Sequence, residues 1–220
     1  MKNILILLLL PNFLFAELLL EITKGSDNPY RIAIVPFEGS DKSVSTMVDI
    51  IKADLIRSGE FFSLSEEMLL SIPKTIDDIK PSEWKLLNID FIVIGKVINE
   101  DDISLKASYE IYDVNKKSKI RSSTVYGIPG KLRQLAHYIS DGIYESVTGM
   151  KGISTTKILY VNEVTDGLQI NYILYVADAD GSNEAVLLKS NEPIISPAWS
   201  PDSKKIAYVS FETGMAKVFI

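Results

Sequence analysis

The residues of this chain that could do chemistry are few, and none stands in a recognisable catalytic or metal-binding pattern. His137 is the one histidine among 220 residues, and a lone histidine without cysteine or a second histidine does not make a typical zinc site. The chain has no G-x-S-x-G nucleophile elbow, no G-x-G-x-x-G motif and no phosphate-binding Gly-Lys-Ser/Thr loop. We therefore interpret His137 as a packing or surface hydrogen-bonding residue within a helix, and we expect no catalytic residue, metal or cofactor.

The clustered acidic residues are interpreted as turn residues. The pairs Asp77-Asp78 and Asp101-Asp102 are adjacent, so their side chains point apart in a strand or loop and do not form a general acid–base pair. The run Asp178-Ala179-Asp180-Gly181 only partly resembles a calcium loop, because it lacks the spaced ligands and terminal glutamate of an EF-hand. A hairpin turn with glycine at positive φ explains that run better.

Composition excludes several further classes. The chain has no cysteine, which rules out disulfides, thiolate ligands, cysteine nucleophiles and the acylated cysteine of a bacterial lipoprotein. Lys+Arg 23 against Asp+Glu 29 gives a net charge of −6, and the one lysine cluster, Lys116, Lys117 and Lys119, falls in an expected hairpin turn. Nucleic acid is therefore not an expected partner. With 46% apolar and 24% charged residues, the chain is expected to form a globular core.

The N-terminus has the pattern of a secretory signal peptide. Lys2 precedes an apolar run over residues 4–10, and the stretch ends on the small residue Ala16. We predict cleavage after Ala16, so that residues 1–16 are removed and the mature chain is periplasmic with a net charge of about −7 (−6 minus Lys2). The competing interpretation is a retained membrane anchor, since Leu18-Leu19-Leu20 prolongs the apolar character.

Two interruptions disfavour the anchor. Pro11 and Glu17 break the apolar run, and a spanning helix needs about 20 unbroken apolar residues. An intact Met1 in the membrane fraction would support the anchor, whereas a mature chain that begins at Glu17 would support the signal peptide.

Alternating strand and helix patterns in residues 29–150 predict an α/β N-terminal domain with a mixed sheet and two main helices. Apolar residues recur at helical spacing in residues 44–57 and 129–148, and a glycine follows each of these runs. The strands are predicted at residues 31–37, 61–64, 90–98, 103–114 and 119–126, and a short helix opens at Pro81. Two helices packed on about five strands make a small α/β sandwich.

From residue 151 the pattern changes to strands alone, and a repeat is present. Residues 157–161 (KILYV) match residues 205–209 (KIAYV) 48 positions later, and Ile173-Leu174 matches Val218-Phe219 45 positions later. A period near 45, with the tetrapeptide Trp199-Ser200-Pro201-Asp202, predicts β-propeller blades. We expect residues 151–220 to hold one blade and about half of another, ending inside a strand, as the start of a longer all-β propeller.

These patterns together resemble the TolB family of the Tol-Pal cell-envelope system. Residues 196–209 (SPAWSPDSKKIAYV) look like the TolB propeller repeat. The landmarks of the N-terminal half are Pro36-Phe37, Ala53-Asp54-Leu55 with Ser58-Gly59, Trp84 with Asp90, and Val147-Thr148-Gly149 with Lys151-Gly152. The order of signal peptide, α/β domain and propeller is also that of TolB. One departure is visible, because Ser203 stands where the family's repeat usually has glycine, and we expect a slightly strained turn there.

The resemblance implies a periplasmic adaptor rather than an enzyme. Proteins of this family bind the lipoprotein Pal through the propeller and the inner-membrane-anchored protein TolA through the mature N-terminus. They maintain outer-membrane integrity and assist constriction at division. The implied partners are TolA-like and Pal-like proteins, with no nucleic acid, small-molecule substrate or cofactor. The membrane is contacted only through these partners, and the full-length protein is expected to be a monomer.

The TolA-contacting segment maps, by this resemblance, to residues 17–28 ahead of the α/β domain. Its members are Glu17, Leu18, Leu19, Leu20, Glu21, Ile22, Thr23, Lys24, Gly25, Ser26, Asp27 and Asn28. Alternation along residues 18–23 is typical of a strand, and residues 25–28 break it. Such a strand can add to the sheet edge of a partner. The alternative is that it forms the first strand of the domain's own sheet, and an exchange between the two stays open.

Two other functions stay open at this point. Propellers with the same Trp-Ser-Pro-Asp element precede the catalytic domain of prolyl-oligopeptidase-like serine peptidases, although the α/β domain ahead of the propeller argues against that class. A sugar-binding or surface-attachment propeller without a Tol partner is the third reading. Further blades downstream would favour the adaptor, and a downstream α/β-hydrolase elbow would favour the peptidase.

Overall fold

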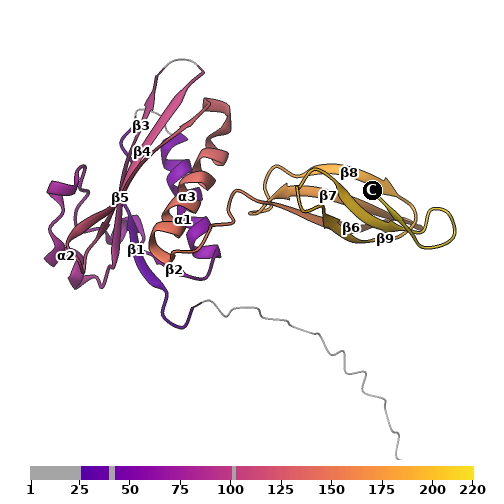
Figure 1. Ribbon diagram of the computed structural model, residues 1–220, viewed down its shortest axis with the longest axis horizontal. Coiled ribbons are helices and arrows are strands. Elements are labelled where there is room, and N and C mark those ends of the chain that lie inside the picture. The colour runs from indigo at the N-terminus through magenta and orange to yellow at the C-terminus, as the bar shows by residue number, and fades with distance from the viewer. Residues whose placement is uncertain (1–25, 40–42, 101–102) are drawn as a thin grey trace, which may run out of the picture.

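The computed structural model describes residues 26–39, 43–100 and 103–220, and they form two lobes (Figure 1). The first lobe is an α/β sandwich and the second contains only strands, so the predicted fold class is confirmed. The predicted signal peptide and residues 17–25 lie outside the described residues, as do Asp101 and Asp102. Among the helices that are described, none is long and apolar enough to cross a bilayer.

The sheet of the first lobe has five strands in the order β2-β1-β3-β4-β5. They are β1 (Tyr30–Ile34), β2 (Phe61–Ser63), β3 (Phe91–Asn99), β4 (Leu105–Asp113) and β5 (Ser118–Gly127). Strand β1 is parallel to both β2 and β3, whereas β3, β4 and β5 are antiparallel. Parallel neighbours need crossover connections, which place a helix on the sheet, while antiparallel neighbours need only tight turns. The sheet is therefore mixed, as the sequence pattern predicted.

Helices α1 (Ser43–Arg57) and α3 (Leu132–Thr148) cover one face of this sheet, and α2 (Pro81–Leu86) lies on the other (Figure 1). The shorter 3₁₀ turns are η1 (Glu66–Met68), η2 (Ile76–Asp78) and η3 (Pro129–Lys131). Successive residues of β1 serve the two faces in turn: Ile32 and Ile34 pack under α1 and α3, and Ala33 joins the opposite core, which contains Trp84. This period of two is what a strand buried on both faces requires.

The end of α3 follows the sequence signal. Gly149 adopts φ +75°, the left-handed conformation that glycine takes without a Cβ clash. Its N–H donates to the Glu145 carbonyl at 2.9 Å and so satisfies one of the last carbonyls of the helix. The helix therefore ends where the sequence predicted.

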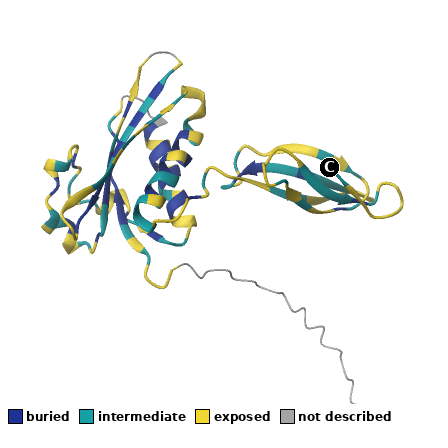
Figure 2. Cartoon of the chain, in the orientation of Figure 1, coloured by how far each residue is buried: buried dark blue, intermediate teal, exposed yellow. Residues whose placement is uncertain are grey.

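The second lobe consists of two antiparallel three-stranded sheets. One sheet contains β6 (Lys157–Asp166), β7 (Gln169–Asp178) and β8 (Ala185–Ser190), in that order. The other contains β9 (Ile194–Trp199), β10 (Ile206–Ser210) and β11 (Lys217–Phe219), with β10 in the middle. Figure 2 shows that most buried residues lie between the sheet and helices of the first lobe, while the second lobe is mainly intermediate or exposed.

Stacked aromatic pairs show how the two sheets repeat. Tyr160 of β6 stacks on Tyr175 of β7 with ring centroids 5.3 Å apart, and Tyr208 of β10 stacks on Phe219 of β11 at 5.5 Å. The strand register pairs these residues directly, so β6 corresponds to β10 at the predicted offset of 48.

The register corrects one part of the predicted repeat. Tyr175, rather than Leu174, occupies the position of Phe219, so the offset between β7 and β11 is 44 and not 45. The physical reason is that the β6–β7 hairpin is four residues longer than the β10–β11 hairpin, and backbone pairing, not residue type, sets the correspondence. The last residue, Ile220, also follows β11 rather than lying within it.

The turn after β9 is strained, as expected from Ser203. Ser203 has φ +56°, a region that glycine adopts freely and other residues adopt at a cost. The turn is held by the Asp202 carboxylate, which accepts from the Ser200 hydroxyl at 2.6 Å and from the Lys204 N–H at 3.2 Å. By contrast, the turn after β7 has Gly181 at φ +81°.

We predict that Ser203→Gly stabilises the second lobe by about 1 kcal/mol, because it removes the Cβ from a left-handed position. Thermal denaturation followed by circular dichroism measures the change. Gly181→Ser, the reverse exchange in the first sheet, serves as the control and should destabilise. A Ser203→Gly variant that is no more stable than the wild type would show that the turn holds no strain.

A close approach in the first core generates a second prediction. The Phe37 ring lies directly over Gly95 of β3, and a Cβ added there would overlap the ring. We expect Gly95→Ala to lower the free energy of unfolding by about 1–3 kcal/mol, measured by urea denaturation. Gly130→Ala is the matched control, because a Cβ at Gly130 would meet no atom within 4 Å. Equal stability of the two variants would contradict the packing described.

Candidate functional site

The predicted partner segment joins the first lobe beside the turn between α1 and β2. Of its members, Ser26, Asp27 and Asn28 are described, and they precede β1 without belonging to a strand. The Ser26 N–H donates to the Gly59 carbonyl at 2.9 Å. This bond fixes the point where the segment meets the lobe, close to the edge strand β2. Residues 17–25 lie outside the described part of the chain, so their strand character stays a prediction.

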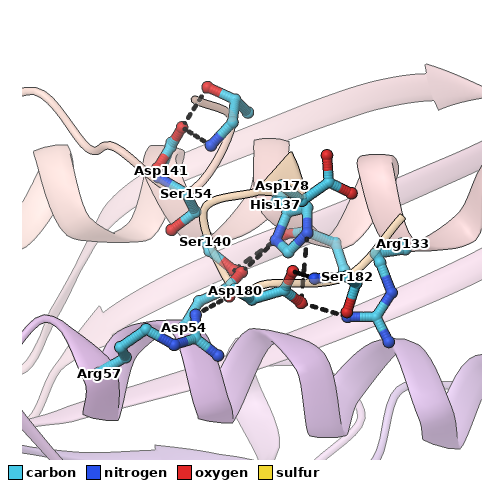
Figure 3. Close-up of polar contacts among 12 residues, drawn as sticks. Asp54, Arg57, Arg133, His137, Ser140, Asp141, Ser154, Asp178, Asp180 and Ser182 are labelled. Atoms are coloured by element: carbon cyan, nitrogen blue, oxygen red, sulfur yellow. Dashed lines mark hydrogen bonds and ion pairs between the residues drawn. The ribbon is translucent and has the colours of Figure 1, made fainter. Parts of the chain in front are cut away.

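The most concentrated polar site lies where the two lobes meet, and its centre is the carboxylate of Asp54 (Figure 3). Asp54 is on α1 and is buried to 4% exposure. Its Oδ1 accepts from Arg57 Nη1 at 2.8 Å, and its Oδ2 accepts from Ser140 Oγ at 2.8 Å. His137 Nδ1 lies 2.6 Å from the same Oδ2. Three groups from two helices therefore surround one buried charge.

The turn that follows β7 completes this site from the second lobe. Arg133 of α3 donates to Asp180 Oδ2, and the Ser182 N–H donates to Asp180 Oδ1 at 2.9 Å. His137 Nε2 lies 3.8 Å from Asp180 Oδ2. The imidazole of His137, itself 3% exposed, thus stands between a carboxylate of each lobe. We call Asp54, Arg133, His137 and Asp180 the junction cluster.

A second contact fastens the connection between the lobes to α3. The Asp141 carboxylate accepts from the Ser154 N–H at 2.7 Å and from the Thr155 N–H at 3.0 Å. Gly152 lies so close to Asp141 that an added Cβ would be 2.7 Å from the Asp141 Cα. Gly152 is therefore required by close backbone approach, which explains a landmark that the sequence showed only as part of a motif.

Hydrogen bonding keeps the acidic members of the junction cluster ionised. Burial by itself raises the pKa of Asp54, but hydrogen bonds from His137, Arg57 and Ser140 outweigh burial and bring the pKa below that of an ordinary aspartate. Burial also raises the pKa of Asp180, and the Ser182 amide with the charges of Arg133 and His137 lowers it by more.

The junction cluster does not have the geometry of a catalytic triad. In a triad the serine hydroxyl bonds the histidine nitrogen that the carboxylate leaves free. Here the one hydrogen of the Ser140 hydroxyl is shared between Asp54 Oδ2 and the Ala136 carbonyl, and Ser140 is fully buried. His137 Nε2 has no hydrogen-bond partner among the described residues. The arrangement therefore supplies no activated nucleophile.

The junction cluster also fits a metal ion poorly, although Asp54, His137 and Asp180 are near enough to share one. Both oxygens of Asp54 accept from protein donors, and Asp180 Oδ2 accepts from the Arg133 guanidinium. Only His137 Nε2 is left as a ligand atom, and an adjacent guanidinium repels a cation. The cluster therefore attaches one lobe to the other by hydrogen bonds and ion pairs.

Comparison with known proteins identifies the family to which both lobes belong. The TolB amino-terminal domain family matches residues 18–120, and the TolB beta propeller domain family matches residues 144–220. The chain belongs to the TolB family. It is 42% identical over 210 residues to the Tol-Pal system protein TolB of Nitrosococcus oceani and 40% identical over 197 residues to that of Alcanivorax borkumensis.

The structural comparison agrees with this assignment to TolB. The crystal structure of TolB from Acinetobacter baumannii superposes with a TM-score of 0.79 at 36% identity, covering 90% of this chain and 48% of that one. The alignments cover 94% and 90% of this chain but 48% and 45% of the Nitrosococcus and Alcanivorax proteins. The chain thus spans about half the length of the curated TolB proteins that it matches.

Sequence reasoning located some members of this TolB junction without seeing the site. The hairpin turn at residues 178–181 is confirmed, and the packing interpretation of His137 is confirmed in that its ring is buried. Its pairing with Asp54 was missed. One signal was available, because Asp54 interrupts the apolar face of α1 next to Ile51 and Leu55, and an acidic residue on a buried face needs a partner.

The buried carboxylate of Asp54 generates a pH prediction. Because the pKa of Asp54 is lowered in the folded state, its ionised form stabilises the protein above about pH 4, the ordinary range of an unfolded aspartate. This stabilisation is lost as the pH falls through the lower, folded pKa. We expect Asp54→Asn to lower the free energy of unfolding by about 3 kcal/mol at neutral pH and to flatten its decline below about pH 4.

Urea denaturation at a series of pH values measures both effects. Asp49→Asn, an exposed position on the same helix, is the matched control and should keep the wild-type stability and pH dependence. If the free energy of unfolding of Asp54→Asn fell with pH as steeply as that of the wild type, the Asp54 carboxylate would not be the group that links stability to pH.

Proposed function

We propose that this TolB-family chain is part of a periplasmic adaptor that links an inner-membrane-anchored TolA protein to the outer-membrane lipoprotein Pal. The observation that carries the proposal is the combination of both TolB domain families in one chain with 42% identity to a Tol-Pal system protein TolB. In this role the protein is not an enzyme. It maintains outer-membrane integrity and assists constriction at cell division through its contacts alone, and it reaches the membrane only through its partners.

The edge of the first sheet supports a partner-binding role for residues 17–28. Strand β2 is at one end of the sheet, and no described strand pairs with its outer side. The segment leaves the lobe next to this edge, through the bond from Ser26 to Gly59. A strand that starts beside the lobe can extend away from it and pair with the sheet of another protein. Its alternating residues 18–23 would then give one apolar face to that partner.

The peptidase alternative has no support in the described residues. Their one histidine bonds a carboxylate and leaves its second nitrogen without a hydrogen-bond partner, and the adjacent serine is fully buried. The relatives compared above are named as Tol-Pal system proteins. The predicted cleavage after Ala16 and the domain limits at residues 28 and 150 stay predictions.

Deletion of residues 17–28 tests the adaptor role. We expect the deletion to abolish binding of TolA measured by isothermal titration calorimetry, while circular dichroism shows the same fold, because β1 starts only at Tyr30. Leu19→Asp and Leu20→Asp form a matched pair on opposite faces of the expected strand. Because only one face would be buried by the partner, their affinities should differ by about tenfold.

Unchanged affinity after the deletion would reject the partner role of the segment. Capture of Pal by the full-length protein is the separate test of the propeller contact, and it should be independent of the deletion.

A further inference from the structure

We infer that protonation of His137 locks the two lobes together, so that their relative placement responds to pH. This goes beyond the adaptor function, because it concerns how one half of the molecule is held against the other. The observation behind it is a buried imidazole placed between carboxylates that belong to different lobes, Asp54 on α1 and Asp180 in the turn after β7 (Figure 3).

The first step is the state of Nδ1. His137 Nδ1 lies 2.6 Å from Asp54 Oδ2, which also accepts from Ser140 Oγ. An ionised carboxylate is an acceptor only, so Nδ1 carries the hydrogen in either charge state of the ring. The first lobe therefore fixes the tautomer, and Nε2 is the nitrogen whose protonation varies.

The second step is what Nε2 faces. It is buried and has no hydrogen-bond partner among the described residues, and Asp180 Oδ2 lies 3.8 Å away. When Nε2 is protonated, the imidazolium attracts the Asp180 carboxylate across the lobe boundary. When it is not, a buried lone pair faces a carboxylate, which is an unfavourable contact. The attraction across the lobe boundary therefore depends on the charge of the ring. Histidine is the side chain whose charge ordinarily changes between about pH 5 and 8, which is the range to test.

The third step is the balance of charge around the ring from every element that packs against it. From α1 come Asp54 and Arg57, from η3 comes Lys131, and from α3 comes Arg133. From the end of β7 and the turn after it come Asp178 and Asp180, and from β6 comes Lys157. The carboxylates are buried, with side chains at 0%, 11% and 5% exposure, whereas Arg57, Arg133 and Lys157 are 36% to 51% exposed and Lys131 is exposed. The ring therefore lies next to three buried carboxylates, while the cations around it face water.

A route for protons is also present. His137 lines a cavity of about 490 Å³ between α3 and the turn after β7, together with Ser154 and Asp178. The Arg133–Asp180 and Asp141–Ser154 bonds do not involve the imidazole. Deprotonation should therefore loosen the lobes rather than separate them.

The test is the distance between two spin labels, one on each lobe, measured by pulsed electron resonance in the full chain. Because the chain has no cysteine, Lys85→Cys on α2 and Lys189→Cys on β8, both exposed, give two unique labelling sites. We expect a narrow distance distribution at about pH 5.5 and a broader one at about pH 8, with the docked fraction changing about tenfold relative to the undocked one.

Three variants make the test specific. Asp180→Asn removes the charge in the second lobe without touching the core of the first, and His137→Asn removes the titrating group. Both variants should give a broad distance distribution at each pH. Asp202→Asn, an aspartate in the corresponding turn of the other sheet, should respond to pH as the wild type does. A wild-type distribution that is the same at both pH values, or a pH response that survives Asp180→Asn, would overturn the proposal, even if His137→Asn does not fold.

Discussion

The carboxylate of Asp54 is the constraint around which the meeting point of the two lobes is built. A buried charge must be satisfied by hydrogen bonds or ion pairs, and Asp54 finds its donors on its own helix and on α3, in Arg57, His137 and Ser140. These bonds to Asp54 therefore fix the position of α1 along α3. They also turn the imidazole of His137 toward the second lobe, where Asp180 lies.

The rest of the first lobe makes this placement possible. Strand β1 is parallel to both of its neighbours, so the chain must cross over the sheet, and α1 provides one of these crossovers. Helix α3 follows the antiparallel hairpin of β4 and β5 and packs beside α1. The apolar faces of both helices pack on the sheet. Their polar residues Asp54 and His137 lie beside these faces, where His137 meets the turn after β7.

The attachment between the lobes has a polar character that suits the proposed adaptor role. An interface of hydrogen bonds and ion pairs can be weakened without exposing a large apolar core, in contrast to the core beneath α1 and α3. In the function proposed above, the N-terminal segment and the propeller lobe contact different partners. The junction cluster, together with the contact of Asp141 with Ser154, is thus the physical connection through which the two contacts would influence each other.

The periodicity of the sequence by itself determined the layer structure: five strands, two main helices, their order and the glycine that ends α3, because burial on one or both faces imposes a period of 3.6 or 2. It also determined the repeat between β6 and β10, since equivalent strands bury equivalent residues. Only the tertiary structure decided that Asp54, His137 and Asp180 meet, because they are 83 and 43 residues apart in sequence and no local pattern encodes a contact across two helices and a turn. The tertiary structure also decided the offset between β7 and β11, because it depends on which residues pair across the strands and neighbouring apolar residues look alike in sequence.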